Sequence, residues 1–314
     1  MERPTAIVAW KTRVMSATDA PVPSGVRLWL AGARPRTLPA AVVPVLVGGA
    51  CAAGTDGPTW WRVAPALVVS LSLQVGVNFA NDYSDGVRGT DRERVGPLRL
   101  VGSGAASPAA VKRAALVALG VAGGAGLVLA AVTTWWLLVV GAAAMVAAWT
   151  YTGGPRPYGY AGLGEVFVFL FFGVVATVGT QFVVAESFST TGWLASVAVG
   201  CFACGLLVIN NLRDIPGDTV SGKRTLAVKM GDAATRKFFA LLVIVAAVAV
   251  AGTAVTSNVW ALAGLVGVVA MRPALDAVAR GARGPALISV LGAVGRAQMM
   301  FGATYAVGLA IALA

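Results

Sequence analysis

Long apolar runs recur along this chain, and they constrain its fold more than any other feature. We count nine, at roughly 38–54, 63–81, 113–132, 134–151, 163–185, 192–210, 238–256, 258–273 and 285–312. A run of about 17–25 apolar residues is long enough to cross the hydrocarbon core of a bilayer as a helix. Only 12% of the residues are charged, where about 25% is usual in soluble domains. The sequence therefore predicts an all-α, polytopic membrane protein with about nine transmembrane helices.

The basic residues give this arrangement an orientation. Of the 24 lysines and arginines, all but Arg62 and Arg296 lie in the N-terminal stretch or in alternate connections between apolar segments. Cytosolic loops of membrane proteins carry such an excess of positive charge. Tryptophans, which prefer the membrane–water interface, begin the even-numbered segments on the charge-poor side. We therefore predict a multi-pass protein of the cell membrane with a cytosolic N-terminus. The formal charge of +11 suits anionic lipid headgroups, and no aromatic-basic module points to nucleic acid.

The first residues differ in composition from the rest. Charged residues and prolines interrupt their apolar stretches, so we expect no secretory signal there. We expect residues 1–24 to form a disordered cytosolic tail, Val26–Ala33 a short interfacial helix, and residues 25–314 a single transmembrane domain. Cys201 and Cys204 are spaced as CxxC, but within an apolar segment two small buried side chains are the simpler interpretation. The sequence contains no histidine, which excludes histidine bases, histidine metal ligands and Ser-His triads.

Two acidic stretches stand at the ends of apolar segments, where carboxylates are costly. The first lies within Val77–Leu100, and the second spans Ile209–Asp218. If the helices continue, the polar residues are spaced i, i+3, i+4, i+7 in the first and i, i+4, i+8 in the second, which makes one polar stripe on each helix. These residues are Asn78, Asn81, Asp82 and Asp85 in the first stripe, and Asn210, Asp214 and Asp218 in the second. From the charge pattern, both stripes belong to the cytosolic side.

Facing carboxylates repel one another unless positive charge lies between them. Oxygen ligands without His or Cys favour a hard cation, and Mg²⁺ usually combines one or two carboxylates with substrate phosphates. We therefore predict that Mg²⁺ bridges the two stripes to a phosphorylated substrate. Lys223 and Arg224 could reach the same phosphates, and Arg34 and Arg36 stand at the mouth of the first apolar segment. Three other interpretations stay open: the acids cap helices and balance arginines, the four cations only anchor the chain at the interface, or the acids serve an ion-coupled transporter.

Five stretches of the chain resemble the UbiA superfamily of intramembrane prenyltransferases. NDYSD (81–85) with a following Asp, and NNLRDIPGD (210–218) followed by GKRTLAV, are similar to its two Asp-rich motifs. Three further stretches resemble the branch that prenylates 1,4-dihydroxy-2-naphthoate in menaquinone biosynthesis. They are RPRTLPAAVVPVLVGGA (34–50), NFANDYSDGVRGTDRERVGPLRLVGSG (78–104) and YTGGPRPYGYAGLGEVFVFLFFG (151–173). The resemblance covers about residues 27–312.

The resemblance implies a helical bundle around a central cavity that opens sideways to lipid, with Mg²⁺ as cofactor. It implies that a polyprenyl diphosphate and dihydroxynaphthoate are the substrates, and that the carboxyl group leaves as CO₂. Carried over by position, the metal ligands are Asp82, Asp85, Asp214 and Asp218, which act in catalysis together with Lys223. The substrate-binding candidates are Asn78, Asn81, Asp91, Asn210, Arg213, Arg224, Arg156, Tyr83, Tyr151 and Tyr158, with Tyr160 as a further residue of the cavity.

Two positions depart from the family pattern. Many members carry a third Asp four residues after the second, where this chain has Gly89, and Asp91 is the nearest substitute. Some members carry a Lys after the fourth helix, where this chain has Arg156. Hydroxybenzoate, homogentisate and a ribosyl phosphate stay open as alternative acceptors. The sequence also leaves open the prenyl length, the oligomeric state and the roles of the tail, Arg296 and Gln298.

Overall fold

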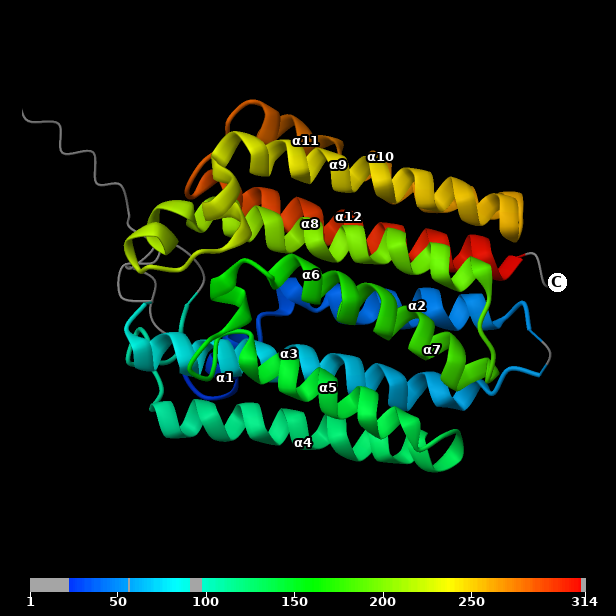
Figure 1. Cartoon of the computed structure of the whole chain (residues 1–314), viewed down its shortest axis with the longest axis horizontal. Helices are drawn as coiled ribbons and strands as arrows, with labels where there is room; N and C mark the ends of the chain where they lie inside the picture. Colours follow the sequence, from blue (N-terminus) through cyan, green and yellow to red (C-terminus); the bar gives the residue numbers. More distant parts are fainter. Residues whose placement is uncertain (1–22, 56, 91–97, 312–314) are drawn as a thin grey trace, which may run out of the picture.

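Helices form every regular element in the computed structural model, which describes residues 23–55, 57–90 and 98–311. The long helices lie side by side and nearly parallel, and the described ranges contain no strand (Figure 1). The predicted all-α class is therefore confirmed. The predicted tail falls almost wholly outside the described residues, so its disorder stays a prediction.

The elements follow one another in a simple order. The first half contains α1 (Val26–Ala33), η1 (Pro35–Thr37), α2 (Pro39–Ala52), η2 (Trp60–Arg62), α3 (Val63–Arg88), α4 (Pro108–Val132) and α5 (Trp136–Thr150). The second half contains η3 (Tyr158–Ala161), α6 (Gly164–Val168), the π-helical η4 (Phe169–Val175), α7 (Ala176–Ala185), α8 (Thr190–Val220), α9 (Leu226–Thr256), η5 (Val259–Gly264), α10 (Leu265–Ala270), α11 (Arg272–Ala279) and α12 (Ala286–Ile311).

Within the described ranges, seven helical segments are long and apolar enough to cross a membrane. They are Trp60–Arg88, Pro108–Val132, Gly164–Ala185, Thr190–Val220, Leu226–Thr256, Val259–Ala279 and Ala286–Ile311. An eighth exists if the bent pair Val26–Thr37 and Pro39–Ala52 is one span. α5 has 15 residues, a rise of about 22 Å, which is shorter than a hydrocarbon core of about 30 Å. Nine crossings therefore remain a prediction, although each predicted segment does lie on helix.

Helix continues beyond the apolar runs into the two long connections between segments, roughly 82–112 and 211–237, and the second of these is largely helical. α3 continues to Arg88, and α8 continues through Pro216 to Val220. α9 begins at Leu226 instead of near residue 238 and is kinked at Gly231, where φ is 76°. Apolarity fades at these ends because the helices carry the polar residues there, although the backbone remains helical. The condition for both polar stripes is therefore met.

Local sequence signals set several helix ends. Ser107 Oγ accepts the N–H of Ala110 at 3.3 Å at the start of α4, and Ser189 Oγ accepts the N–H of Gly192 at 3.0 Å at the start of α8. Such side chains satisfy amides that have no partner within the helix. α3 ends at Gly89, whose φ of 73° suits a residue without Cβ. Gly89, where many members of the family that the sequence resembles carry an Asp, thus terminates this helix.

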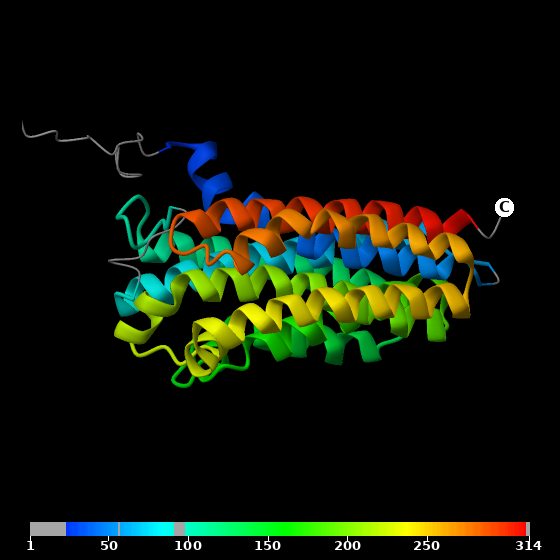
Figure 2. The same cartoon turned by 90° about the horizontal axis from the view of Figure 1, so that it is seen from above.

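α8 is the central helix of the bundle. In an apolar stretch of 18 residues, 78% of the α8 residues are buried inside the bundle, whereas 28% are buried in the corresponding stretch of α4. η4 approaches α8 closely, because a Cβ at Gly173 would lie 2.6 Å from the Cα of Gly200. Cys201 and Cys204 of α8 are buried free thiols, as expected for small core side chains. The C-terminal ends of α3 and α8 lie at the same end of the bundle as α1, and α12 finishes at the opposite end (Figures 1 and 2).

Candidate active site

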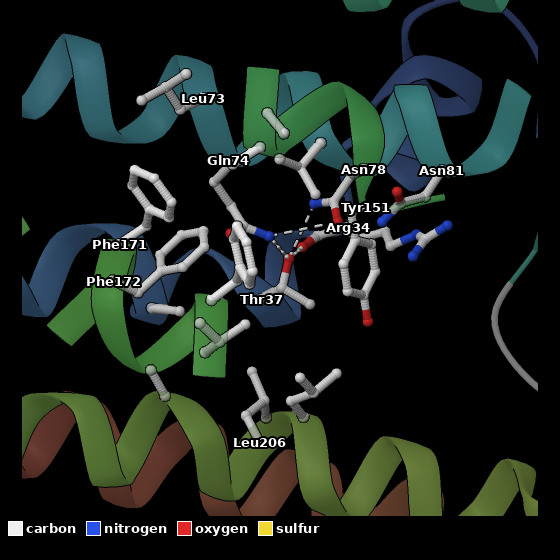
Figure 3. Close-up of a pocket in the computed structure, with 18 of the residues that line it drawn as sticks. Arg34, Thr37, Leu73, Gln74, Asn78, Asn81, Tyr151, Phe171, Phe172 and Leu206 are labelled. Atoms are coloured by element: carbon white, nitrogen blue, oxygen red, sulfur yellow. Dashed lines mark hydrogen bonds between the residues drawn. The ribbon is translucent and has the colours of Figure 1, made fainter. Parts of the chain in front are cut away.

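A cavity of about 710 Å³ lies inside the bundle, polar at one end and apolar at the other. Its walls come mainly from α2, α3, α5, α7 and α8, together with the η3 turn. Figure 3 shows Arg34, Asn81 and Tyr151 on one side of it, and Leu73, Phe171 and Phe172 on the other. A cavity of this size suits a small organic ligand.

Asp85 of α3 marks the polar end, and three side chains converge on its carboxylate. The Tyr160 hydroxyl donates to Oδ1 at 2.5 Å, Lys223 Nζ lies 3.2 Å from the same oxygen, and a guanidinium nitrogen of Arg99 lies 3.9 Å from Oδ2. Burial, and after it the negative charge of Asp85, raises the pKa of Tyr160 above its usual value, so the phenol stays a donor. Because Lys223 lies three residues after the end of α8, its ion pair joins the polar ends of α3 and α8.

The second stripe lies on α8, as its spacing predicts. Arg213 Nε and Nη2 donate to the two carboxylate oxygens of Asp214 at 2.7 and 2.8 Å, and Nη2 also donates to Asn210 Oδ1 at 2.8 Å. Asp218 lines the same cavity one turn further along the helix. Arg213 Nη1 is buried and has no hydrogen-bond partner among the described residues. An incoming anion could take up this donor.

The polar end offers oxygen ligands that suit Mg²⁺. Asn81, Asp85, Asp214 and Asp218 all line the cavity, and carboxylate and carbonyl oxygens are the preferred ligands of this ion. In the part of the chain that the structure describes, no three Asp, Glu, Cys or His residues are grouped so that they could hold a metal by themselves. The ligand set therefore fits ions that are shared with phosphate oxygens and water.

Asp82 is Asp85's neighbour on α3, but it makes different contacts. Its carboxylate is fully buried and accepts the N–H of Leu100 at 2.8 Å and the N–H of Val101 at 2.9 Å. Adjacent helix positions are rotated by about 100°, so Asn81 faces the cavity while Asp82 does not line it. The residue we predicted as a metal ligand thus anchors the segment that carries Arg99 into the cavity.

Other predicted substrate-binding residues also lie outside the cavity lining. Tyr83 packs against Trp149, with 6.2 Å between the ring centroids. Arg156 and Arg224 are exposed, because both occupy turns at the surface of the bundle end. Asp91 lies outside the described residues.

Some cavity residues were absent from the predicted site. Arg99 lies beside Asp85, and Thr152 Oγ1 donates to Asn81 Oδ1 at 2.8 Å, which fixes the orientation of that amide. Arg99 lies in stretch 78–104 and Thr152 in stretch 151–173. Both stretches resemble the family, so the resemblance pointed to the parts of the sequence that contain these two residues. Asn78 does line the cavity, but it uses its amide on the chain entering α2, donating to Thr37 Oγ1 at 3.0 Å.

Aromatic side chains form one wall of the cavity next to the polar end. Tyr151 and Tyr158 lie in the lining, as predicted, with 5.4 Å between their ring centroids. Tyr158 stacks on Phe167 at 3.9 Å, and Phe171 follows 6.1 Å further along. Aromatic faces attract cations and also stack on aromatic ligands.

Beyond this wall the lining becomes apolar and extends between α3, α4, α5 and α7. Val69 lies 16 residues before Asp85 on α3, so the lining extends about 24 Å along the helix. Gly126, Gly141 and Gly179 contribute no side chain to it, and a Cβ added at Gly141 or Gly179 would meet nothing within 4 Å. The apolar end therefore has room for a long hydrocarbon chain.

Comparisons with known proteins agree with this geometry. The model of the UbiA prenyltransferase family matches residues 41–285. The chain is 47% identical to the 1,4-dihydroxy-2-naphthoate octaprenyltransferase of Mycobacterium tuberculosis, over 90% of this chain and 96% of that protein. The apo structure of a UbiA homologue from Aeropyrum pernix K1 matches with a TM-score of 0.67 and 15% identity, over 86% of this chain and 97% of that chain. A UbiA homologue from Archaeoglobus fulgidus bound to DMAPP and Mg²⁺ matches with a TM-score of 0.61 and 15% identity, over 90% and 99%. These two likenesses show the fold.

Proposed function

The chain belongs to the UbiA prenyltransferase family, and we propose that it transfers a polyprenyl group from its diphosphate to 1,4-dihydroxy-2-naphthoate, giving demethylmenaquinol for menaquinone biosynthesis. The observation that carries this proposal is the 47% identity, over 90% of the chain, to an enzyme of that name. The cavity supports it, because a charged end joined to a long apolar end matches a diphosphate joined to a polyprenyl chain.

The diphosphate would bind at the polar end of the cavity. Oxygen atoms of Asn81, Asp85, Asp214 and Asp218 would hold Mg²⁺, which when bound neutralises charge that develops on the leaving diphosphate. Arg99, Arg213 and Lys223 at this end each lie within 4 Å of a carboxylate, as in the 3.2 Å contact between Lys223 and Asp85. With substrate bound, these cations would share their charge with phosphate oxygens, and charge-assisted bonds of this kind are among the strong ones.

Prenyl transfer begins when the carbon–oxygen bond of the donor breaks and its electron pair leaves with the diphosphate. The remaining allylic cation would lie beside the aromatic wall of Tyr151, Tyr158 and Phe167. Ring faces stabilise a nearby cation electrostatically. The apolar end of the cavity would hold the rest of the prenyl chain.

The acceptor ring supplies the electrons for the new bond. The carbon that bears the carboxylate attacks the cation, and the carbon–carboxyl bond then breaks. Its electron pair returns to the ring, and CO₂ leaves. Since no ring proton is removed at this carbon, the reaction needs no strong base, which suits a chain without histidine.

The chain is a multi-pass membrane protein, with at least seven described helices fit to span a bilayer. We propose that it lies in the cell membrane with the polar end of the cavity at the cytosolic face. The support is the gathering of basic residues on that side of the apolar segments. Water-soluble Mg²⁺ and the acidic acceptor could then reach the site without crossing the bilayer.

An acceptor panel tests this function. Purified protein in lipid vesicles is given a polyprenyl diphosphate, Mg²⁺ and one acceptor at a time: dihydroxynaphthoate, 4-hydroxybenzoate or homogentisate. We expect diphosphate release and a prenylated product with dihydroxynaphthoate alone. Asp214→Asn serves as the negative control and should lose about a hundredfold in rate. A preference for another acceptor would refute the acceptor assignment, and no diphosphate release with any acceptor would refute the whole proposal.

A further inference from the structure

Asn211 of α8 lines the cavity next to the acidic stripe of that helix, without belonging to the stripe. We propose that its amide oxygen accepts a hydrogen bond from a ring hydroxyl of the aromatic acceptor, and that the buried Glu165 holds the amide in that orientation. This inference rests on the proposed function, and it identifies the feature of the acceptor that this part of the site selects.

Glu165 carries a carboxyl group that is buried in an apolar helical segment. It lies in α6, within the segment Gly164–Ala185 that is apolar enough to cross a membrane, and 4% of its surface is exposed. Its Oε1 accepts a hydrogen bond from Asn211 Nδ2 at 2.9 Å, whereas its Oε2 is buried and has no hydrogen-bond partner among the described residues. Ionisable side chains at such positions are costly and usually serve a function. Because Glu165 itself does not line the cavity, Asn211 connects it to the site.

Four asparagines line the cavity, and Asn211 differs from the other three in the use of its amide oxygen. In the other three a protein side chain donates to Oδ1, and the pairs are Gln74 to Asn78, Thr152 to Asn81 and Arg213 to Asn210. The Asn211 side chain makes one hydrogen bond within the described ranges, from Nδ2 to Glu165. An amide oxygen can accept two hydrogen bonds. Asn211 therefore offers the cavity an acceptor that no donor of the described chain occupies.

The surroundings of Asn211 suit an aromatic ring. α6 packs against α8 (Figure 1), and Leu207 precedes Asn211 by one turn of α8. A Cβ added at Gly164 would lie 3.6 Å from the Tyr151 hydroxyl and 3.4 Å from Leu207 Cδ2, and Tyr151 and Leu207 both line the cavity. Figure 3 shows the Tyr151 side chain projecting into the cavity. The Asn211 amide thus lies on the side of α8 where the aromatic wall begins, so a ring stacked on that wall would bring its edge to the amide.

The acceptor carries the donor that this oxygen lacks. Dihydroxynaphthoate has two ring hydroxyls, and each can donate one hydrogen bond. Because Asn211 Nδ2 is bonded to Glu165, the amide keeps its oxygen, and not its N–H groups, for the ligand. A ring without a hydroxyl would leave the amide oxygen without a donor after water is displaced, and such a loss disfavours the wrong ligand. Asn211 and Glu165 together therefore select a hydroxylated ring.

The test compares the wild type with Asn211→Leu, Glu165→Leu and Glu165→Gln. The control is Gln298→Leu, because Gln298 is a buried amide of α12 that lies outside the cavity lining. Calorimetry without prenyl diphosphate measures the binding of 1,4-dihydroxy-2-naphthoate and of 2-naphthoate, which keeps the carboxylate but has no hydroxyl. Steady-state kinetics gives separate KM values for dihydroxynaphthoate and for the prenyl diphosphate. Calorimetry does not depend on turnover, so it can be read even if the wild type prenylates a different acid.

We expect the wild type to bind dihydroxynaphthoate about tenfold more tightly than 2-naphthoate. Asn211→Leu and Glu165→Leu should each lose this preference and raise the acceptor KM about tenfold. Their affinity for 2-naphthoate and their KM for the prenyl diphosphate should stay at wild-type values. Glu165→Gln should keep most of the preference, because its amide oxygen can still accept from Asn211 Nδ2. Gln298→Leu should match the wild type in every measurement.

A double variant guards the test against a failure to fold. Asn211→Leu leaves the buried Glu165 carboxyl group without its hydrogen-bond partner, which lowers stability. Glu165→Leu combined with Asn211→Leu removes both partners, and replacing both by apolar groups of similar shape costs little. This double variant should lose the preference for dihydroxynaphthoate to the same extent as either single variant, since Glu165 acts through Asn211.

Four results would overturn the inference. Equal wild-type affinities for the two acids, or an unchanged preference in the double variant, would exclude recognition of a hydroxyl by Asn211. Equal losses of affinity for both acids would leave Asn211 with a structural role only. A raised KM for the prenyl diphosphate alone would assign Asn211 to the diphosphate. A Glu165→Gln protein as impaired as Glu165→Leu would refute the holding role of Glu165. By contrast, a wild type that shows the Asn211-dependent preference but does not prenylate dihydroxynaphthoate would contradict only the proposed function.

Discussion

Asp82→Asn tests whether Asp82 anchors a segment of the chain or binds Mg²⁺. Both oxygens of Asp82 accept backbone N–H groups, from Leu100 at 2.8 Å and from Val101 at 2.9 Å, in a fully buried position. Asparagine keeps one acceptor but turns an N–H toward the other amide. The variant therefore leaves two donors facing each other, at the segment that brings Arg99 to the cavity.

The size of the effect follows from these contacts. A hydrogen bond to a charged acceptor contributes about 1.5–3 kcal/mol, and an unsatisfied buried donor costs about 1–3 kcal/mol. We therefore expect Asp82→Asn to lower the free energy of unfolding by about 2–4 kcal/mol. If the loosened segment withdraws Arg99 from the diphosphate, the loss of one charged contact raises the donor KM by about tenfold.

The assay is a double-mutant cycle in detergent-purified protein. Thermal unfolding and donor KM are measured for Asp82→Asn, Arg99→Gln and the double variant, and the Mg²⁺ dependence of the rate is recorded for each. The KM effects of the two substitutions should not add, because both act through the same guanidinium. The Mg²⁺ concentration for half-maximal rate should stay unchanged in Asp82→Asn, and Asp85→Asn should lose activity about a hundredfold. An Asp82→Asn protein with wild-type Tm and an altered Mg²⁺ dependence would refute the reasoning.

Three further substitutions probe other parts of the structure. Tyr160→Phe removes the hydroxyl that donates to Asp85 at 2.5 Å, and it should lower kcat/KM for the prenyl diphosphate about tenfold. Because burial raises the pKa of Tyr160, the wild type should keep this hydrogen bond until the pH exceeds the ordinary tyrosine pKa of about 10. Equal kcat/KM values for the variant and the wild type would refute this role of Tyr160. Gly141→Leu places a side chain in the apolar end of the cavity, so it should raise the KM for long prenyl diphosphates and leave the KM for short ones unchanged. Gly124 is exposed and lies outside the cavity lining, so Gly124→Leu should change neither KM. An equal rise in KM for long and short prenyl diphosphates in Gly141→Leu would contradict this prediction. Arg62→Gln should lower the unfolding free energy by about 3 kcal/mol, because this buried guanidinium ties α3 to the ends of α4 and α7; an unchanged Tm would argue against the tie.

The positions of the acidic stripes could be predicted from the sequence because helix geometry links spacing to direction. α8 carries Asn210, Asp214 and Asp218 on one face through Pro216, as the i, i+4, i+8 pattern requires. Asp85 of the first stripe and Asp214 and Asp218 of the second line the same cavity, so residues far apart in sequence lie at one site. Hydropathy alone placed the C-terminal ends of α3 and α8 too early, near residues 81 and 210. Mean hydropathy falls where a helix carries polar residues toward a cavity, although the backbone there remains helical.

The different contacts of Asp82 and Asp85 could not be predicted from the sequence motif. Asp82 and Asp85 stand in the same five-residue stretch, and their contacts differ because Leu100 and Val101 donate to Asp82 from one side of α3. That contact joins residues 18 apart in the chain, which no local pattern encodes. Arg156 and Arg224 lie outside the cavity lining for a similar reason. Both residues are in turns, and the direction of a turn depends on tertiary packing that the sequence pattern does not encode.

The most direct test of the account follows the carboxyl carbon and the diphosphate in one reaction. Purified protein in vesicles receives polyprenyl diphosphate, Mg²⁺ and carboxyl-labelled 1,4-dihydroxy-2-naphthoate, and the product, the released gas and the diphosphate are quantified together. The account predicts a prenylated naphthoquinol without the label, and labelled CO₂ in equal amount to diphosphate. A prenylated product that keeps the label, or diphosphate release without prenylation, would contradict it.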